Sequence, residues 1–324
     1  MTETALLEIE DLAVTLRAGP REITPVDGVS LAVLPGEALG VVGESGSGKS
    51  LTLKAIVGLL PPAARTAGAL RLDGRRYAPE AVRGRGIAMI FQEPMTALNP
   101  TMRVGDLIAE PLRLHRGVSR RAGRERAIEL MRQVGIPDAP RRARAWPHEL
   151  SGGLRQRVMI AAALATEPRL LLCDEPTTAL DVCVQDQILG LLRTLVRERG
   201  MSMLFVTHDL AVIGELCDRV AVMYAGRVVE IGATDAVLAA PHHPYTDALL
   251  RSAPSFADSS ERLRDIAGRP PDPRAFPPGC RFAPRCAFAR DDCRGADGRL
   301  VPSDDGRWTA CIHPEVLMTP ADAR

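Results

Sequence analysis

Apolar and polar residues alternate along the first part of the chain with the period of a β-strand. The alternation covers residues 6–16, and a second strand is expected over 25–33, with a polar loop over 17–24 between them. Successive side chains in a strand point to opposite faces, so each of these strands can bury one face. Further strands are expected at residues 38–42, 69–74 (with a turn) and 87–91.

The pattern changes to helical spacing between about Met95 and Pro168. Residues 104–112 and 120–134 carry apolar side chains at helical intervals, and Gly135-Ile136-Pro137 ends the second helix. Apolar strands return with helices between them, at residues 170–174, 203–207 and 220–224. This alternation requires crossover connections, so the fold class is α/β with a mostly parallel core sheet.

Composition and charge narrow the function classes. The chain has 324 residues, 46% hydrophobic and 25% charged, and its formal net charge is +1. Neutral charge and only 3% aromatic residues disfavour nucleic acid as a partner. No apolar run approaches the ~18 residues of a membrane span, and residues 1–4 lack the basic start of a signal peptide. We therefore expect a soluble, cytoplasmic protein.

The stretch Gly43-Glu44-Ser45-Gly46-Ser47-Gly48-Lys49-Ser50 fits G-x-x-x-x-G-K-[ST], the pattern of a phosphate-binding P-loop. A buried strand precedes it and an apolar helix follows it, as the motif requires. Glycines let the backbone approach an anion, and the helix N-terminus directs N–H groups toward that anion. The lysine supplies charge to the β- and γ-phosphates of ATP, and the last serine a hydroxyl for Mg²⁺. The nucleotide-binding residues expected here are Gly43, Ser45, Gly46, Gly48, Lys49 and Ser50.

A second phosphate-site element follows the apolar strand at residues 170–174. Asp174 emerges at the carboxyl end of this strand, where α/β sheets bind ligands, and can hold Mg²⁺. Glu175 comes next and can orient or deprotonate the water that attacks the γ-phosphate. Beside a P-loop, these two residues predict a site for ATP hydrolysis.

Ser151-Gly152-Gly153 stands just before an apolar, alanine-rich helix and forms a second candidate anion site. Ser151 suits an N-cap, and the glycines let N–H groups approach a phosphate. The chain has one P-loop but two such elements. We therefore expect the second element to complete a nucleotide site on another subunit.

Three more motifs establish a resemblance to a known family. Gln92 follows an apolar strand, Asp181 ends Thr178-Ala179-Leu180-Asp181, and His208 lies in Val206-Thr207-His208-Asp209. Over about residues 5–250 the order and spacing resemble an ATP-binding subunit of an ABC transporter. Residues 150–156 resemble its signature motif, and the three motifs above resemble its Q-loop, D-loop and switch histidine.

The resemblance implies that ATP is sandwiched between one subunit's P-loop and the partner's signature motif. Ser151 and Gly153 would then read the γ-phosphate across a dimer, with Gly152 and Asp181 also at the nucleotide. His208 would hydrogen-bond the γ-phosphate, and Gln92 would sense Mg²⁺ and couple to the membrane subunit.

Leu16 is a departure from the family pattern. It stands where members usually have an aromatic residue that stacks on adenine. An aliphatic side chain can still cover the base, but it loses a stacking contribution of about 0.5–1.5 kcal/mol.

Other segments resemble the oligopeptide/dipeptide/nickel import ATPases, specifically their first ATPase subunit. They are residues 92–100, 177–185, His243-Pro244-Tyr245-Thr246 and the cysteine-containing tail. The resemblance implies these partners: a second, homologous ATPase subunit in a heterodimer, two transmembrane permeases and an extracytoplasmic solute-binding protein. It implies a peripheral location on the cytoplasmic face of the inner membrane. Peptides are the expected solute, with nickel or another small solute as the alternative. A non-transport ABC ATPase is the competing class, but such proteins typically carry two cores or a coiled-coil insertion.

The tail contains four of the seven cysteines, Cys280, Cys286, Cys293 and Cys311. In a reducing compartment such clustering suggests metal rather than disulfides. The spacing is not that of a zinc ribbon, but four thiolates can hold Zn²⁺ or a [4Fe–4S] cluster. Reduced cysteines without metal are the third possibility, and the family resemblance favours the cluster.

These observations predict a P-loop ATPase with a mostly parallel core sheet, an N-terminal antiparallel β subdomain, an inserted helical subdomain and a small C-terminal extension. The expected division is residues 1–94 with 168–250 for the core, 95–167 for the helical signature subdomain, and 251–324 for the extension.

Overall fold

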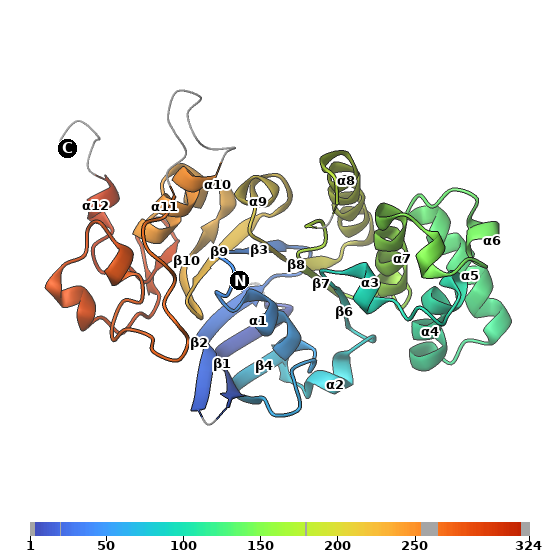
Figure 1. Ribbon diagram of the computed structural model, residues 1–324, viewed down its shortest axis with the longest axis horizontal. Helices are drawn as coiled ribbons and strands as arrows, with labels where there is room; N and C mark the ends of the chain where they lie inside the picture. Colours follow the sequence, from blue (N-terminus) through green and yellow to red (C-terminus); the bar gives the residue numbers. More distant parts are fainter. Residues whose placement is uncertain (1–3, 20, 179, 254–264, 319–324) are drawn as a thin grey trace. The chain divides into compact units, whose positions relative to one another are not determined.

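The computed structural model describes residues 4–19, 21–178, 180–253 and 265–318. The chain divides into two compact units, Met1–Arg76 with Val206–Arg324, and Tyr77–Phe205. The first unit contains the P-loop and the tail, and the second contains the expected signature helix (Figure 1). Residues 254–264 and 319–324 of the predicted extension lie outside the described residues.

The first unit begins with a four-stranded antiparallel sheet in the order β2-β1-β4-β5 (Figure 1). Its strands are β1 (Leu7–Ala18), β2 (Arg21–Val33), β4 (Arg65–Leu72) and β5 (Arg75–Arg76). Leu7, Val14, Val26 and Val33 are buried, as the alternating pattern requires. The predicted N-terminal antiparallel sheet is confirmed.

The loop predicted over residues 17–24 was wrong, because both strands continue into it as a hairpin. Arg17 pairs with Glu22, and the hydroxyls of Thr15 and Thr24 lie 3.4 Å apart across the strands. Polar side chains can face solvent on an outer strand surface, so polarity alone did not mark a loop here.

The first unit also holds the strands around the P-loop. They are β3 (Ala38–Val42), β9 (Arg219–Tyr224), β10 (Arg227–Ala233), β11 (Val301–Pro302) and β12 (Trp308–Thr309). β3 and β9 are parallel, whereas β10 pairs antiparallel with β9 and with β12, and β12 with β11. The tail thus adds strands to the edge of β10.

Short helices complete the first unit. They are α1 (Lys49–Ile56), α9 (Leu210–Leu216), α10 (Thr234–Ala239), α11 (Pro244–Ser252), α12 (Glu315–Met318) and the 3₁₀ turns Ala283–Arg285 and Asp291–Arg294. In α11 the His243 ring caps the helix, because its Nδ1 accepts the Tyr245 N–H at 3.0 Å.

The second unit combines parallel strands with a group of helices. β6 (Ile87–Ile90) and β7 (Leu170–Asp174) are parallel. β8 (Ser202–Thr207) begins in this unit and ends in the first, and it lies next to β7 in the strand order. All five residues of β7 are buried, as a strand covered on both faces requires. The parallel pairs β3–β9 and β6–β7 confirm the α/β class expected from the alternating elements.

Capping side chains and a glycine mark where several helices of the second unit begin or end. They are α2 (Pro79–Val82), α3 (Pro94–Ala97), α4 (Val104–Arg116), α5 (Arg120–Gln133), α6 (Ala139–Arg142), the 3₁₀ turn Pro147–Glu149, α7 (Gly152–Leu164) and α8 (Val182–Arg199). Ser119 caps α5 and Asp181 caps α8 with their side-chain oxygens, and Gly117 ends α4 in the left-handed conformation. Helices α4, α5 and α7 pack against one another (Figure 1).

In the described ranges, no helix combines the length and apolar character that crossing a membrane requires. The predicted division into core, helical subdomain and extension stays a prediction.

Candidate nucleotide-binding site

The predicted site residues are distributed over both units. The first unit carries Leu16, the P-loop and His208, and the second carries Gln92, Ser151, Gly152, Gly153, Asp174, Glu175 and Asp181.

The P-loop joins the buried strand β3 to helix α1, as its sequence predicts. At Gly48 φ is 104°, in the left-handed region, and a Cβ there would lie 2.9 Å from the Pro25 carbonyl oxygen. A Cβ at Gly43 would lie 2.1 Å from the carbonyl oxygen of Met223. Only glycine fits either position, so the loop can curl tightly and leave its backbone open to an anion. Ser45 and Gly46 lie exposed at its tip.

The Lys49 ammonium folds back over this loop. Its Nζ donates to the carbonyl oxygens of Gly43 at 2.7 Å and of Glu44 at 3.1 Å, and the residue is buried. The Ser47 hydroxyl is also buried, and no hydrogen-bond partner for it lies in the described part of the chain. Charged acceptors such as phosphate oxygens form stronger hydrogen bonds to an ammonium than main-chain carbonyls do. The loop therefore fits a phosphate, which Lys49 and Ser47 can both contact.

Asp174 and Glu175 stand at the carboxyl end of β7. Asp174 is buried as the last residue of the strand, and Glu175 is half-buried. The φ of Glu175 is 44°, a left-handed value that non-glycine residues rarely adopt and that often marks functional sites. Its carboxylate accepts hydrogen bonds from the Thr178 hydroxyl at 2.9 Å and from the Gln92 amide at 3.4 Å. Within this unit, the structure brings Gln92 and Glu175 together.

The signature segment begins helix α7. Ser151 occupies the N-cap position, as predicted, but its side chain makes no capping hydrogen bond and is exposed. The Ser151 hydroxyl therefore does not cap the helix. A Cβ at Gly153 would lie 2.7 Å from Val184 Cγ1, while at Gly152 the nearest such contact is Leu180 at 3.7 Å.

Arg155 joins the signature helix to the segment that follows Gln92. Its guanidinium donates to the Pro147 carbonyl oxygen and to Met95 Sδ, both at 2.7 Å.

The remaining predicted residues occupy ordinary structural positions. Asp181 Oδ1 accepts the Val184 N–H at 3.0 Å, so it caps α8 whatever else it does; Ala179 of the same motif lies outside the described residues. His208 is exposed after β8. Leu16 is half-buried on β1, opposite Ile23 of β2.

The four tail cysteines line one small cavity, together with Phe282 and His313. Among the described residues, no three of the four sulfur atoms lie within 4.8 Å of one another. Four thiols that line one cavity form a donor set that thiolate-bound metal groups use, either a zinc ion or an iron–sulfur cluster.

Burial raises the pKa of the Cys311 thiol to about 12 and also raises the pKa values of Cys280 and Cys286. These groups stay protonated near neutral pH until a metal displaces their protons. The residues that lie close enough to share a single ion are Asp292, Cys293 and His313.

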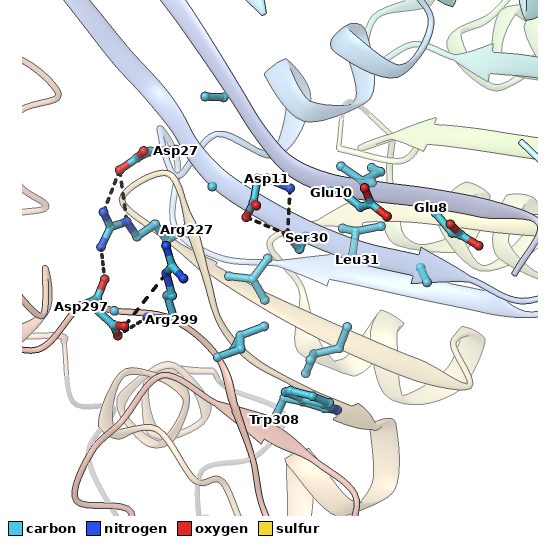
Figure 2. A pocket seen from close by; sticks show the side chains of 18 of the residues that line it. Glu8, Glu10, Asp11, Asp27, Ser30, Leu31, Arg227, Asp297, Arg299 and Trp308 are labelled. Atoms are coloured by element: carbon cyan, nitrogen blue, oxygen red, sulfur yellow. Dashed lines mark hydrogen bonds and ion pairs between the residues drawn. The ribbon is translucent and has the colours of Figure 1, made fainter. Parts of the chain in front are cut away.

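The first unit also contains a cavity of about 800 Å³ (Figure 2). It is lined by strands β1, β2 and β10 and by the tail, with Trp308 on one side. Two of its charged residues pair with each other: Asp27 accepts hydrogen bonds from Arg227, which also donates to the Asp297 carbonyl oxygen at 3.0 Å. None of the predicted nucleotide residues lines it.

Sequence reasoning missed several residues that contact the site. Thr178 belongs to the motif that ends at Asp181, but its hydrogen bond to Glu175 was not expected. Glu44 occupies a variable position of the P-loop pattern. Tyr245 and Arg285 come from distant segments, yet the Tyr245 hydroxyl accepts the Glu44 N–H at 2.8 Å and Arg285 binds the Glu44 carboxylate. No local signal could have paired them.

Comparison with known proteins identifies the class. A family model described as ABC transporter matches residues 26–178. The dimeric structure of MJ0796, a bacterial ABC transporter cassette, superposes with a TM-score of 0.63 at 30% identity, covering 70% of this chain and 98% of that one. Its post-hydrolysis form with ADP and Pi gives the same values. The fold is that of an ABC ATPase, an enzyme that binds ATP and Mg²⁺ and hydrolyses ATP.

Full-length relatives identify the branch. A model described as Oligopeptide/dipeptide transporter, C-terminal region, matches residues 229–293. A Brucella abortus protein named as a peptide import ATP-binding protein is 48% identical, covering 96% of this chain and 98% of the relative. The dipeptide transport ATP-binding protein DppD of Escherichia coli K12 is 45% identical over 96% of this chain and 97% of the relative. The chain belongs to the ABC transporter family, among the ATP-binding subunits that carry this C-terminal region.

Proposed function

We propose that this chain hydrolyses ATP to power the import of peptides. The observation that carries the proposal is the match over 96% of the chain to relatives named for peptide or dipeptide transport, tail region included. The proposed partners are a second, homologous ATPase subunit, two membrane permeases and an external binding protein, with this chain peripheral to the membrane.

The test is reconstitution of the complete transporter in proteoliposomes. Dipeptides and longer peptides, presented with the binding protein, should stimulate ATP hydrolysis and enter the vesicles. Lys49→Ala is the matched control, since it removes the phosphate-binding charge. Stimulation by Ni²⁺ and not by peptides would replace the peptide proposal with the metal alternative. Unchanged turnover without the binding protein would remove that partner from the proposal.

We further propose roles for the individual side chains. Lys49 and the loop glycines hold the phosphates, and Ser50 and Asp174 supply oxygen ligands to Mg²⁺. Glu175, held by Gln92 and Thr178, orients the hydrolytic water. His208 contacts the γ-phosphate, and Leu16 covers the adenine.

The signature residues are proposed to act across a dimer. Ser151, Gly152 and Gly153, with Asp181, would complete the partner's nucleotide site. The uncommitted Ser151 hydroxyl at the start of α7 supports this role, because a helix N-terminus attracts anions.

For the tail, we propose that Cys280, Cys286, Cys293 and Cys311 hold one [4Fe–4S] cluster with a structural role. Support comes from the cavity that all four cysteines line. A small segment with little apolar area usually needs a metal or a cross-link to hold its fold. Anaerobic purification with iron and sulfide analysis tests this. Stoichiometric zinc, or four titratable thiols without metal, would reject it.

A further inference from the structure

Arg285 lies between two of the tail cysteines in the chain and binds the P-loop. Its Nη1 donates to Glu44 Oε2 at 2.7 Å and its Nη2 to Glu44 Oε1 at 3.1 Å, a two-pronged ion pair. Its side chain is only 4% exposed. Both residues lie in the first unit, so this contact joins the tail directly to the phosphate-binding loop.

The guanidinium is fixed from every side. Nε donates to the Ala267 carbonyl oxygen at 2.8 Å, Nη2 also to that of Ile266 at 3.2 Å, and Nη1 also to the Tyr224 hydroxyl at 3.2 Å. Five hydrogen bonds from one planar group leave it little freedom, so the position of the Glu44 carboxylate is set as well.

Glu44 is held at its main chain too. Its N–H donates to the Tyr245 hydroxyl, and its carbonyl oxygen accepts from Lys49 Nζ at 3.1 Å and from the Ser47 N–H at 3.2 Å. Tyr224, Tyr245 and Phe282 form an aromatic cluster with tilted and edge-to-face rings, whose centroids lie 4.5–5.4 Å apart. The tail and the P-loop therefore both contact the same aromatic cluster.

A carboxylate inside a phosphate-binding loop poses an electrostatic problem. A negative charge close to a polyanion is repelled strongly unless a cation neutralises it. The P-loop pattern does not require an acid at this position. This chain has one, and a buried arginine of the tail covers it.

We propose that Arg285 is a positioning residue of the nucleotide site: it neutralises the Glu44 carboxylate and holds it away from the phosphates. The cysteine-containing tail thereby sets the affinity of the P-loop for ATP. This inference rests on the proposed role of the P-loop in binding nucleotide.

The test uses the full chain and measures the dissociation constant of Mg-ATP by fluorescence or calorimetry. Arg285→Met should weaken binding on the order of tenfold, the usual size of coupling between two linked sites. Adding Glu44→Gln to that variant should restore affinity to near wild type, because the unpaired charge is gone. Equal weakness of the single and double variants would overturn the proposal.

The control is Arg281→Met, which removes another buried arginine of the same tail. Arg281 pairs with Asp27 of β2 rather than with the P-loop, so Mg-ATP affinity should stay unchanged. Equal weakening by Arg281→Met would show that any damage to the tail has this effect, against the proposal. If Arg285→Met does not fold, Arg285→Lys replaces it in the test. Lysine keeps the positive charge but cannot form the two parallel hydrogen bonds of a guanidinium, so this variant should bind Mg-ATP with intermediate affinity.

Two further readouts separate positioning from structure. In the assembled transporter, Arg285→Met should raise the KM for ATP while kcat stays near wild type, since Glu175 is untouched. A fall in kcat at unchanged KM would contradict the inference. If Lys49→Ala still binds Mg-ATP, the proposed nucleotide site itself fails. If Lys49→Ala loses binding but Arg285→Met keeps it, only the inference fails.

Discussion

The P-loop and the cysteine-containing tail meet at Glu44, but they are held in opposite ways. The P-loop is a run of consecutive residues, and Lys49 bonds to carbonyl oxygens five and six positions earlier. Residues of the tail find their partners far along the chain: Arg285 pairs with a residue 241 positions away and Arg281 with one 254 away. The bonds of Lys49 are specified by the local sequence, although Tyr245 and Arg285 also hold Glu44 from far along the chain. The position of the tail, in contrast, depends on the rest of the unit being folded.

The largest effect should come from residues that lie close together in the sequence, directly after strand β7. Glu175→Gln should lower ATP turnover by about 100-fold or more, the usual cost of losing a general base, while Mg-ATP still binds. Thr178→Val, which removes only one hydrogen bond to Glu175, should cost about fivefold. Steady-state hydrolysis in the assembled transporter measures both. Wild-type-like turnover by Glu175→Gln would show that the water is activated elsewhere.

The next effect acts on a neighbouring subunit. In a mixed complex, Gly153→Asp in this chain alone should prevent nucleotide trapping at the partner's P-loop. A carboxylate about 4 Å from phosphate costs about 4 kcal/mol at an effective dielectric near 20. Damage confined to this chain's own P-loop would refute the cross-dimer arrangement.

That variant needs a control, because a side chain at Gly153 also meets Val184. Gly153→Ala with Val184→Ala relieves the clash without adding charge. This pair should trap nucleotide at the partner's site, which separates repulsion from crowding.

A smaller effect is expected on the long-range side. Cys286→Ser should remove iron and destabilise the tail by about 2–5 kcal/mol, as losing a covalent staple does in a small lobe. Exposed Cys183 on α8 is the control, and Cys183→Ser should retain iron. Metal analysis and limited proteolysis report the outcome. Full iron content in Cys286→Ser would remove that residue from the ligand set.

The smallest effect is a pH dependence of stability at His243. Complete burial lowers its pKa from 6.5 to about 3. Between these values the unfolded chain binds more protons, so stability is present above about pH 6.5 and falls as the pH drops, by at most about 1.4 kcal/mol per unit. His243→Asn keeps a capping acceptor but cannot titrate. Denaturant unfolding between pH 7.5 and 5 should show a shallower fall for this variant; parallel curves would contradict the assignment.

The contrast also explains what the sequence could predict. The P-loop, the strand ending at Asp174 and the helices around residues 104–133 follow from local patterns and appear where expected. The hairpin over residues 17–24 and strand β10 did not, since polar outer faces and edge pairing leave weak local signals. The left-handed φ of Glu175 had no signal in the sequence, since non-glycine residues rarely adopt it. The Arg285–Glu44 pair was also beyond reach, because its two residues lie 241 positions apart.

Strand β12 has a consequence for handling this protein. Thr309 and Trp308 pair with Glu230 and Ile231, and the Ala310 N–H donates to the Val229 carbonyl oxygen at 2.8 Å. An unpaired outer strand is a template on which other chains can add, and natural proteins hide such edges. Because β12 pairs with β10, the tail covers this edge, and we expect it to limit self-association. Versions of the chain shortened before residue 300 should therefore precipitate or form fibrils, even where the ATPase elements still fold.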